Sequence, residues 1–82
     1  MTRLLQPAPE VAVELGPEGA PARMHGPDGG SLEPVSRWLV EQDWWERPVA
    51  REYWKVLLGN RLLLEVFHDL LEDRWHLERV YD

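Results

Sequence analysis

The stretch 50–81 limits the possible folds more than any other part of this chain. It contains the only phenylalanine, both tyrosines, two of the five tryptophans and most of the leucines. Its last part, 74–81 (RWHLERVY), alternates strictly between two sets of side chains, which is typical of a strand. The part 51–58 is rich in strand-forming residues, and Gly59-Asn60 after it is a hairpin signal. These patterns predict three antiparallel strands at 51–58, 62–68 and 74–81.

The middle segment, 61–72, also permits a helix. Its apolar residues recur with helical spacing at Leu62, Leu63, Val66, Phe67, Leu70 and Leu71. The preceding turn, the β-forming pair Val66-Phe67 and the short connection to Arg74 favour a strand instead. We therefore predict a mainly β fold, a small antiparallel meander or partly open barrel of about six strands. The alternative is an α+β fold with a helix at 61–72.

Two hairpin registers decide which side chains form the core. A connection over 70–73 pairs Val66 with Leu77 and Leu64 with Arg79. The first hairpin has either a two-residue Gly-Asn loop or a three-residue loop that includes Arg61, and a one-residue slip exchanges the two faces. Burial of Trp54 and Val56 outweighs a turn preference of about 1 kcal/mol, which favours the longer loop. The predicted core face then carries Trp54, Val56, Leu58, Leu62, Leu64, Val66, Trp75, Leu77 and Tyr81.

The opposite face keeps much apolar surface in this register. Leu63, Phe67 and Val80 lie on it, together with Tyr53 and Leu57. A solvated sheet face should carry polar residues instead, so we predict self-association through Leu63, Phe67 and Val80 as a homodimer. The competing explanation is that the N-terminal strands fold back and cover this face within one chain.

The N-terminal half is simpler. Residues 1–9 are predicted to be a flexible tail, because Pro7 and Pro9 block regular pairing. Residues 10–82 form one small β domain. Its first strands are expected at 10–15 (EVAVEL), at 20–25 and in the second half of 31–41, after a bend or an edge at Pro34, with turns at 16–19 and 26–30.

Composition excludes several function classes. The chain has 82 residues, a net charge of −6 and no cysteine, so we expect no disulfide, no thiolate metal site and no tight non-specific DNA binding. We also expect no membrane span, no cofactor and a cytoplasmic location. No nucleophile elbow or phosphate loop is present, so we predict that the chain is not an enzyme. His25, His68, Asp69 and His76 could hold a metal, but exposed strand histidines are the simpler interpretation.

An aromatic corner supplies the candidate binding residues. Trp44 and Trp45 lie beside Arg47, with Arg51 and Tyr53 just beyond. Aromatic and arginine side chains dominate protein interfaces and can also stack on bases. We predict a protein-partner surface at Trp44, Trp45, Arg47, Arg51 and Tyr53. The alternative is a weak single-stranded nucleic-acid binder that uses these residues with Arg37, and a simpler role for the tryptophans is to plug one end of the sheet.

One set of motifs resembles a known family. The residues are Arg37-Trp38, Trp44-Trp45, Arg51, Tyr53-Trp54, Val66-Phe67-His68-Asp69, Arg74-Trp75 and Val80-Tyr81-Asp82. They resemble the small C-terminal accessory domain of ImuB-type proteins, which are inactive Y-family-polymerase-like subunits of bacterial translesion machinery, and the free-standing relatives of that domain.

The resemblance covers roughly 11–82 and implies a mainly β fold. It implies a non-enzymatic accessory role in DNA repair or translesion synthesis, through contact with a polymerase or repair subunit. This chain departs from the family pattern at Gly30-Ser31-Leu32 and at Leu70-Leu71-Glu72-Asp73, where the family usually has an arginine with an aromatic residue and a glycine, respectively.

Overall fold

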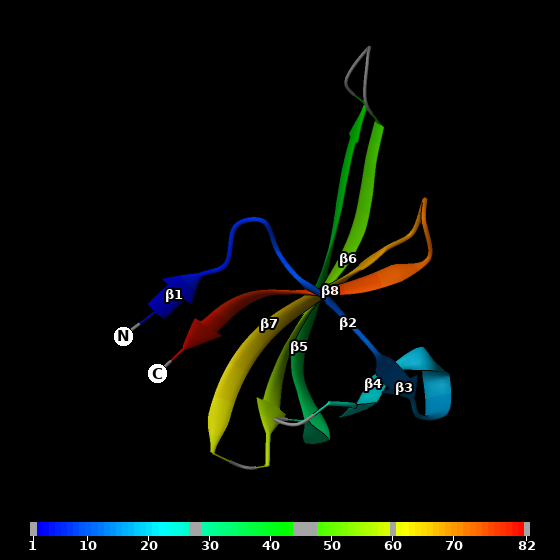
Figure 1. Cartoon of the computed structure of the whole chain (residues 1–82). Coiled ribbons are helices and arrows are strands. Elements are labelled where there is room, and N and C mark those ends of the chain that lie inside the picture. Colours follow the sequence, from blue (N-terminus) through cyan, green and yellow to red (C-terminus); the bar gives the residue numbers. More distant parts are fainter. Residues whose placement is uncertain (1, 27–28, 44–47, 60, 82) are drawn as a thin grey trace.

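Strands make up most of the part of the chain that the computed structural model describes, namely residues 2–26, 29–43, 48–59 and 61–81. They are β1 (Thr2–Leu4), β2 (Glu10–Val11), β3 (Val13–Leu15), β4 (Pro21–Met24), β5 (Gly30–Asp43), β6 (Pro48–Leu58), β7 (Leu62–Asp69) and β8 (Arg74–Tyr81), with a 3-10 turn, η1 (Pro17–Gly19), between β3 and β4 (Figure 1). The mainly β prediction is confirmed. No helix in these residues is long and apolar enough to cross a membrane.

Four long strands, β5 to β8, form an antiparallel meander in which each strand pairs with the next. Pairing of β7 along its whole length with β6 and β8 shows that the helical alternative at 61–72 is wrong. The helical spacing of its leucines arises because apolar residues occupy both faces of a central strand. Register, and not periodicity, therefore decides this segment.

The N-terminal residues extend the sheet at β8. β1 pairs with the end of β8, where Arg3 lies opposite Val80, and the Leu5 amide donates a 2.8 Å hydrogen bond to the Glu78 carbonyl. This corrects the flexible tail predicted for 1–9. The prolines restrict only the connection that follows β1, while the open edge of β8 supplies backbone partners for the strand before it.

β2 and β3 are separated only by Ala12 but pair with different strands. Val11 lies opposite Trp75 of β8, whereas Val13 lies opposite Met24 of β4. One extended segment therefore connects both ends of the sheet, and both valines pack against the core. The hydrogen-bonded order remains open, β1-β8-β7-β6-β5-β4-β3 with β2 beside β8, so the strands described here do not close into a barrel.

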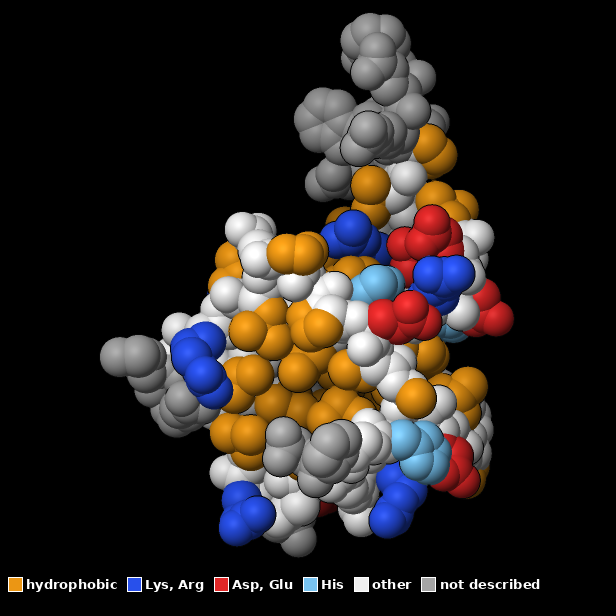
Figure 2. Space-filling model, viewed as in Figure 1, with side chains coloured by type: hydrophobic (Ala, Val, Ile, Leu, Met, Phe, Trp, Pro, Cys, Tyr) orange, Lys and Arg blue, Asp and Glu red, His pale blue; other side chains and the backbone are white. Residues whose placement is uncertain are grey.

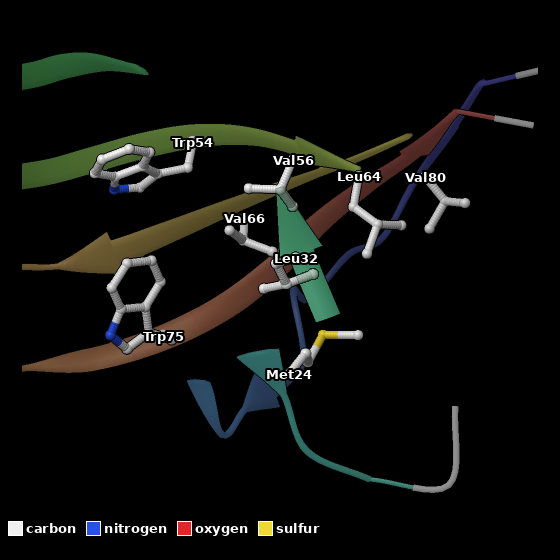
Figure 3. Close-up of a cluster of buried hydrophobic side chains, with 8 residues drawn as sticks. All are labelled: Met24, Leu32, Trp54, Val56, Leu64, Val66, Trp75 and Val80. Atoms are coloured by element: carbon white, nitrogen blue, oxygen red, sulfur yellow. The ribbon is translucent and has the colours of Figure 1, made fainter. Parts of the chain in front are cut away.

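The core lies between the meander and this N-terminal segment. Its buried members are Met24, Leu32, Trp54, Val56, Leu64, Val66, Trp75 and Val80 (Figure 3). Leu58 pairs with Leu62, so the first hairpin has the predicted three-residue connection and Trp54 and Val56 face the core as expected. Full burial of one such aliphatic side chain contributes about 1.5–3 kcal/mol, which makes this face the main source of stability.

A bulge in β8 changes the predicted register at its end. Val66 lies opposite Leu77 as expected, but Glu65 lies opposite Arg79, so Glu78 is an extra residue. Leu64 therefore pairs with Val80 and not with Arg79. The extra residue turns Val80 into the core and directs Tyr81 to the opposite face, which corrects the placement of both.

The bulge also removes most of the predicted self-association surface. Val80 is buried in the core, and Phe67 is only 4% exposed within a single chain. Of the three residues assigned to that surface, only Leu63 is partly exposed. The N-terminal strands do fold back within the chain, but Val13 and Met24 cover the core face and not the face that carries Phe67.

Beyond the rest of the sheet, β5 and β6 continue alone as a two-stranded arm (Figure 1). The pairing of β6 with β7 reaches Arg51, opposite Asp69. Past that point Glu41 pairs with Ala50 and Asp43 with Pro48, on the other side of β6.

Candidate functional site

The predicted partner-binding residues are only partly described by the structure. Trp44, Trp45 and Arg47 lie outside the described residues. Arg51 and Tyr53 lie on β6, on the face opposite the core, and both are partly buried. The site can therefore be built from β6 outward to its neighbours β5 and β7.

Four rings form a continuous row across the sheet on that face. We call Trp38, Tyr53, Phe67 and His76 the aromatic ladder, because they come from β5, β6, β7 and β8 in that order. Consecutive ring centroids lie 5.4, 5.3 and 4.9 Å apart, and the first and last pairs are stacked. Direct cross-strand pairing aligns the first three rings, since Trp38 lies opposite Tyr53 and Tyr53 opposite Phe67.

The ladder is buried at its centre and open at its β5 end. Phe67 is covered by Arg51, whose guanidinium carbon lies 4.5 Å from the ring centroid, and by His76. Trp38 at the other end is 37% exposed. The sheet therefore holds an exposed indole in a fixed position at its margin.

Arg51 and Tyr53 form a polar group beside the ladder. Nη1 of Arg51 donates to the Tyr53 hydroxyl at 3.4 Å, and this hydroxyl donates to Oε1 of Glu78 at 3.4 Å. Arg37 is also engaged within the chain, 3.1 Å from Glu52 and above the Trp54 ring. These arginine charges are partly neutralised by the protein itself, which weakens them as phosphate ligands.

The bulge places two carboxyl groups together on this face. Glu65 is 7% exposed and accepts a 3.1 Å hydrogen bond from the Tyr81 hydroxyl. Burial raises the pKa of Glu78, and Glu65 raises this pKa further through a hydrogen bond and through its charge. Burial likewise raises the pKa of Tyr53. Glu78 therefore keeps its proton to a higher pH than an exposed glutamate does.

β5 itself offers the most accessible part of the molecule. It pairs with β4 only at Gly30 and Ser31, whereas its pairing with β6 runs from Leu32 to Asp43. Over that length, in the described part of the chain, the side of β5 that faces away from β6 has no strand partner. We call this side the β5 edge.

Large apolar side chains accompany the β5 edge. Val35 is 54% exposed and Leu39 is 51% exposed, in addition to Trp38. Sequence reasoning missed Val35, Trp38 and Leu39 as candidate site residues. No signal in the sequence marks these residues, because the open side of a strand is set by its neighbours in the sheet and not by its own residues.

The histidines form no metal site in the residues that the structure describes. His68 stacks on Trp75 at 4.7 Å on the core side, whereas His76 stacks on Phe67 on the other side. His25 lies 3.2 Å from Glu14 and is distant in sequence from His68 and His76. His68 and His76 face opposite ways on the sheet, and both are partly buried, so the interpretation as exposed strand histidines is wrong for these two.

One face of the molecule has a shallow hollow of about 720 Å³ between β1, β4 and the β6–β7 connection. Apolar side chains gather in the middle of the face in Figure 2. The hollow is lined by Arg3, Met24, Gly29, Gly30, Leu58, Gly59, Arg61, Leu62, Leu64, Leu77 and Val80. Its lining residues Met24, Leu64 and Val80 are each under a tenth exposed and belong to the core, so the hollow is a margin of the core.

Comparison of the chain with protein-family models, with curated proteins and with solved structures finds no match. The arrangement of β5, the aromatic ladder and the arm is therefore interpreted from its own geometry.

Proposed function

We propose that this chain is a non-enzymatic protein-interaction module that binds other proteins at the β5 edge. One observation carries the proposal: among the described residues, one side of β5 has no strand partner from Leu32 to Asp43, and Val35, Trp38 and Leu39 are exposed along this strand. An open strand edge offers backbone donors and acceptors to an added strand, while alternate side chains give specificity. Exposed apolar surface of this kind marks interaction sites in soluble proteins.

The aromatic ladder supports the proposal from the adjoining face. Trp38 is held against Tyr53, so a partner meets a rigid aromatic group and pays little entropy to order it. Arg51 beside Tyr53 adds the residue type that accompanies aromatic residues in interface centres. The sequence assigns Trp44, Trp45 and Arg47 to the same partner surface, and these three residues lie outside the described part of the chain.

The resemblance to ImuB-type accessory domains suggests the class of partner. We propose a polymerase or repair subunit, which makes the chain an accessory of DNA repair or translesion synthesis in a bacterial cytoplasm. The test is isothermal titration of the purified protein with the purified translesion polymerase subunits and sliding clamp of the source organism. Binding to one of them is expected, and binding to none contradicts the repair assignment.

Variants locate the binding site in the same titration. Replacing Trp38 with Ala and Leu39 with Ser should weaken binding at least about tenfold, the effect of losing about 1.4 kcal/mol at an interface hot spot. Leu71→Ser is the matched control, because Leu71 is 59% exposed in the β7–β8 connection, away from β5. Equal weakening by the control, or none by the β5 variants, contradicts the assignment of the site.

Single-stranded nucleic acid is the second candidate, because Trp38 is accessible for stacking and Arg37 is 59% exposed. The net charge of −6 and the engagement of Arg37 with Glu52 oppose it. Titration of an oligothymidine at low salt, followed by tryptophan fluorescence, separates the two functions. Saturable quenching that falls steeply with salt would favour nucleic acid over the protein partner.

A further inference from the structure

We propose that the β5 edge pairs with the β5 edge of a second copy of this chain, antiparallel and about a twofold axis at Leu39. This inference rests on the proposed function, since it names one partner strand for the same edge. The surface differs from the one that the sequence predicts for a homodimer, because Phe67 and Val80 are already buried within one chain.

Symmetry limits the possible registers. Antiparallel strands of identical chains pair about an axis normal to the sheet, and such an axis keeps every side chain on its own face. Directly opposed residues always share a face, so the axis must pass through a residue position and not between two positions. In the regular part of the β5 edge, the candidate centres are the residues from Ser36 to Val40.

Only the register centred on Leu39 puts compatible side chains opposite one another at every position from 37 to 41: opposite charges face each other, and apolar residues face apolar residues. It places Arg37 opposite Glu41 of the second copy, Trp38 opposite Val40 of the second copy, and the two Leu39 side chains opposite one another. A centre at Ser36 sets Val35 against Arg37, and a centre at Arg37 opposes two arginines. A centre at Trp38 sets Arg37 against Leu39, and a centre at Val40 sets Leu39 against Glu41.

A centre near Val35 is opposed by the backbone. Pro34 has no amide hydrogen to donate, and the register between β5 and β6 shifts between Pro34 and Ser36. From Ser36 onward β5 pairs with β6 without interruption, so this segment is the straight part of the edge. These features confine pairing to the segment around Leu39.

The side chains of the segment are accessible in one chain. Leu39 is 51% exposed and Arg37 is 59% exposed. Arg37 already contacts Glu52 at 3.1 Å, but a guanidinium has five donors and can also donate to a second carboxylate. Charges of one sign on an edge prevent self-pairing, whereas opposite signs in this palindromic order favour it.

The dimer would also continue the aromatic ladder. Trp38 and Val40 lie on the ladder face, so each Trp38 would pack beside Val40 of the second copy and the two ladders would meet at the axis. Pairing of both β5 edges uses the longest open strand side found in the described part of each chain. Association would therefore stop at two copies and would not continue into a fibre.

Sedimentation velocity of the purified full chain over a concentration series tests the proposal, with no other protein present. The wild type should show a reversible monomer–dimer equilibrium. Arg37→Glu and Glu41→Arg should each weaken dimerisation about tenfold or more, because the twofold axis applies each like-charge pair twice. An equimolar mixture of the two variants should dimerise again, since each chain then meets the opposite charge on the other.

The controls are Arg61→Glu and Glu72→Arg, which make the same charge changes at exposed positions away from β5. They should dimerise like the wild type. Recovery in the mixture also shows that the single variants are folded. A monomeric wild type at millimolar concentration, single variants that dimerise normally, or a mixture that stays monomeric would each overturn the proposal.

The result is independent of the test of the proposed function. A wild type that stays monomeric but binds a repair subunit would overturn only this inference. A dimer that behaves as described, with no effect of the β5 variants on binding to the subunit, would contradict only the function proposed for a second protein.

Discussion

The indole ring of Trp38 lies parallel to the phenol ring of Tyr53, with 5.4 Å between ring centroids and 6° between ring planes. The two residues are directly opposed on β5 and β6. Tyr53 is in turn fixed by Phe67 and by hydrogen bonds to Arg51 and Glu78. An exposed aromatic group at an open strand edge is thus held in place by partly buried neighbours.

This stacking should be measurable as a coupling energy. In a double-mutant cycle of Trp38→Ala and Tyr53→Ala, urea unfolding should give a coupling of about 0.5–1.5 kcal/mol. A second cycle uses the Tyr53→Phe variant as its starting protein, so that the ring is present without the hydroxyl. It again measures the removal of Trp38, of the ring at position 53, and of both. Its coupling to Trp38 should be the same, so a coupling that disappears with the hydroxyl would show that hydrogen bonding, and not stacking, orders Trp38.

Two leucines should differ sharply in their effect on stability. Leu64 is 1% exposed in the core and Leu71 is 59% exposed in the β7–β8 connection. Leu64→Ala should lower the free energy of unfolding by about 2–5 kcal/mol, because it removes buried surface and leaves a cavity. Leu71→Ala should change it by about 0.5 kcal/mol or less. Similar losses at both positions in urea unfolding would contradict the placement of the core.

Glu78 should make stability depend on pH. Its pKa is raised above the ordinary 4.5, so between 4.5 and the raised value the folded state binds more protons than the unfolded state. Stability must then fall as pH rises through this interval and level off above it. Glu78→Gln should flatten this fall and make the protein more stable than the wild type at pH 8. Glu72→Gln, at an exposed position, should leave the slope unchanged, and an unchanged slope in Glu78→Gln would refute the assignment.

At position 73, in the β7–β8 connection, glycine should destabilise the protein less than alanine. Asp73 has φ of 57°, in the left-handed region, and its carboxylate lies 2.7 Å from Nε2 of His68. Asp73→Gly and Asp73→Ala both lose that contact, but only alanine keeps the steric cost of about 1–2 kcal/mol at this φ. Asp73→Gly should therefore unfold at higher urea concentration than Asp73→Ala. Equal midpoints would show that the connection relaxes to another conformation.

Asp73 also explains how this connection forms without a glycine. Aspartate tolerates the left-handed region better than most residues, so no glycine is required. Asp69 accepts hydrogen bonds from the amides of Leu71 and Glu72 at 3.0 and 3.3 Å and closes the same connection. Turn chemistry can thus be recognised from residue types only when acidic residues are considered beside glycine.

Local sequence was sufficient for the meander but not for its irregularities. The burial of Trp54 and Val56 predicts the three-residue connection, because one register buries more apolar surface than the other. The bulge at Glu78 leaves no such signal, since Val80 and Tyr81 are both suited to a core position. What decides between them is the hydroxyl of Tyr81, which needs the polar partner that Glu65 provides.

Long-range pairing was also beyond the sequence. Nothing near β1 indicates that Thr2 would lie opposite Tyr81. Residue types alone place the candidate site at Trp44, Trp45, Arg47, Arg51 and Tyr53. The exposed apolar side chains that the structure adds are Val35, Trp38 and Leu39. Their importance comes from the strand that is absent beside β5, and an absent neighbour has no residue pattern of its own.

Residue-resolved amide hydrogen exchange of β5 tests the central claim, that this edge is open and takes an added strand. In dilute monomer, every second amide between Ser36 and Glu41 should exchange fast, and the alternate amides, directed to β6, should exchange slowly. At concentrations where the protein is dimeric, the fast set should become protected, while β7, paired on both sides, stays slow throughout. Protection of both sets in the monomer, or a fast set that remains fast in the dimer, would contradict the account.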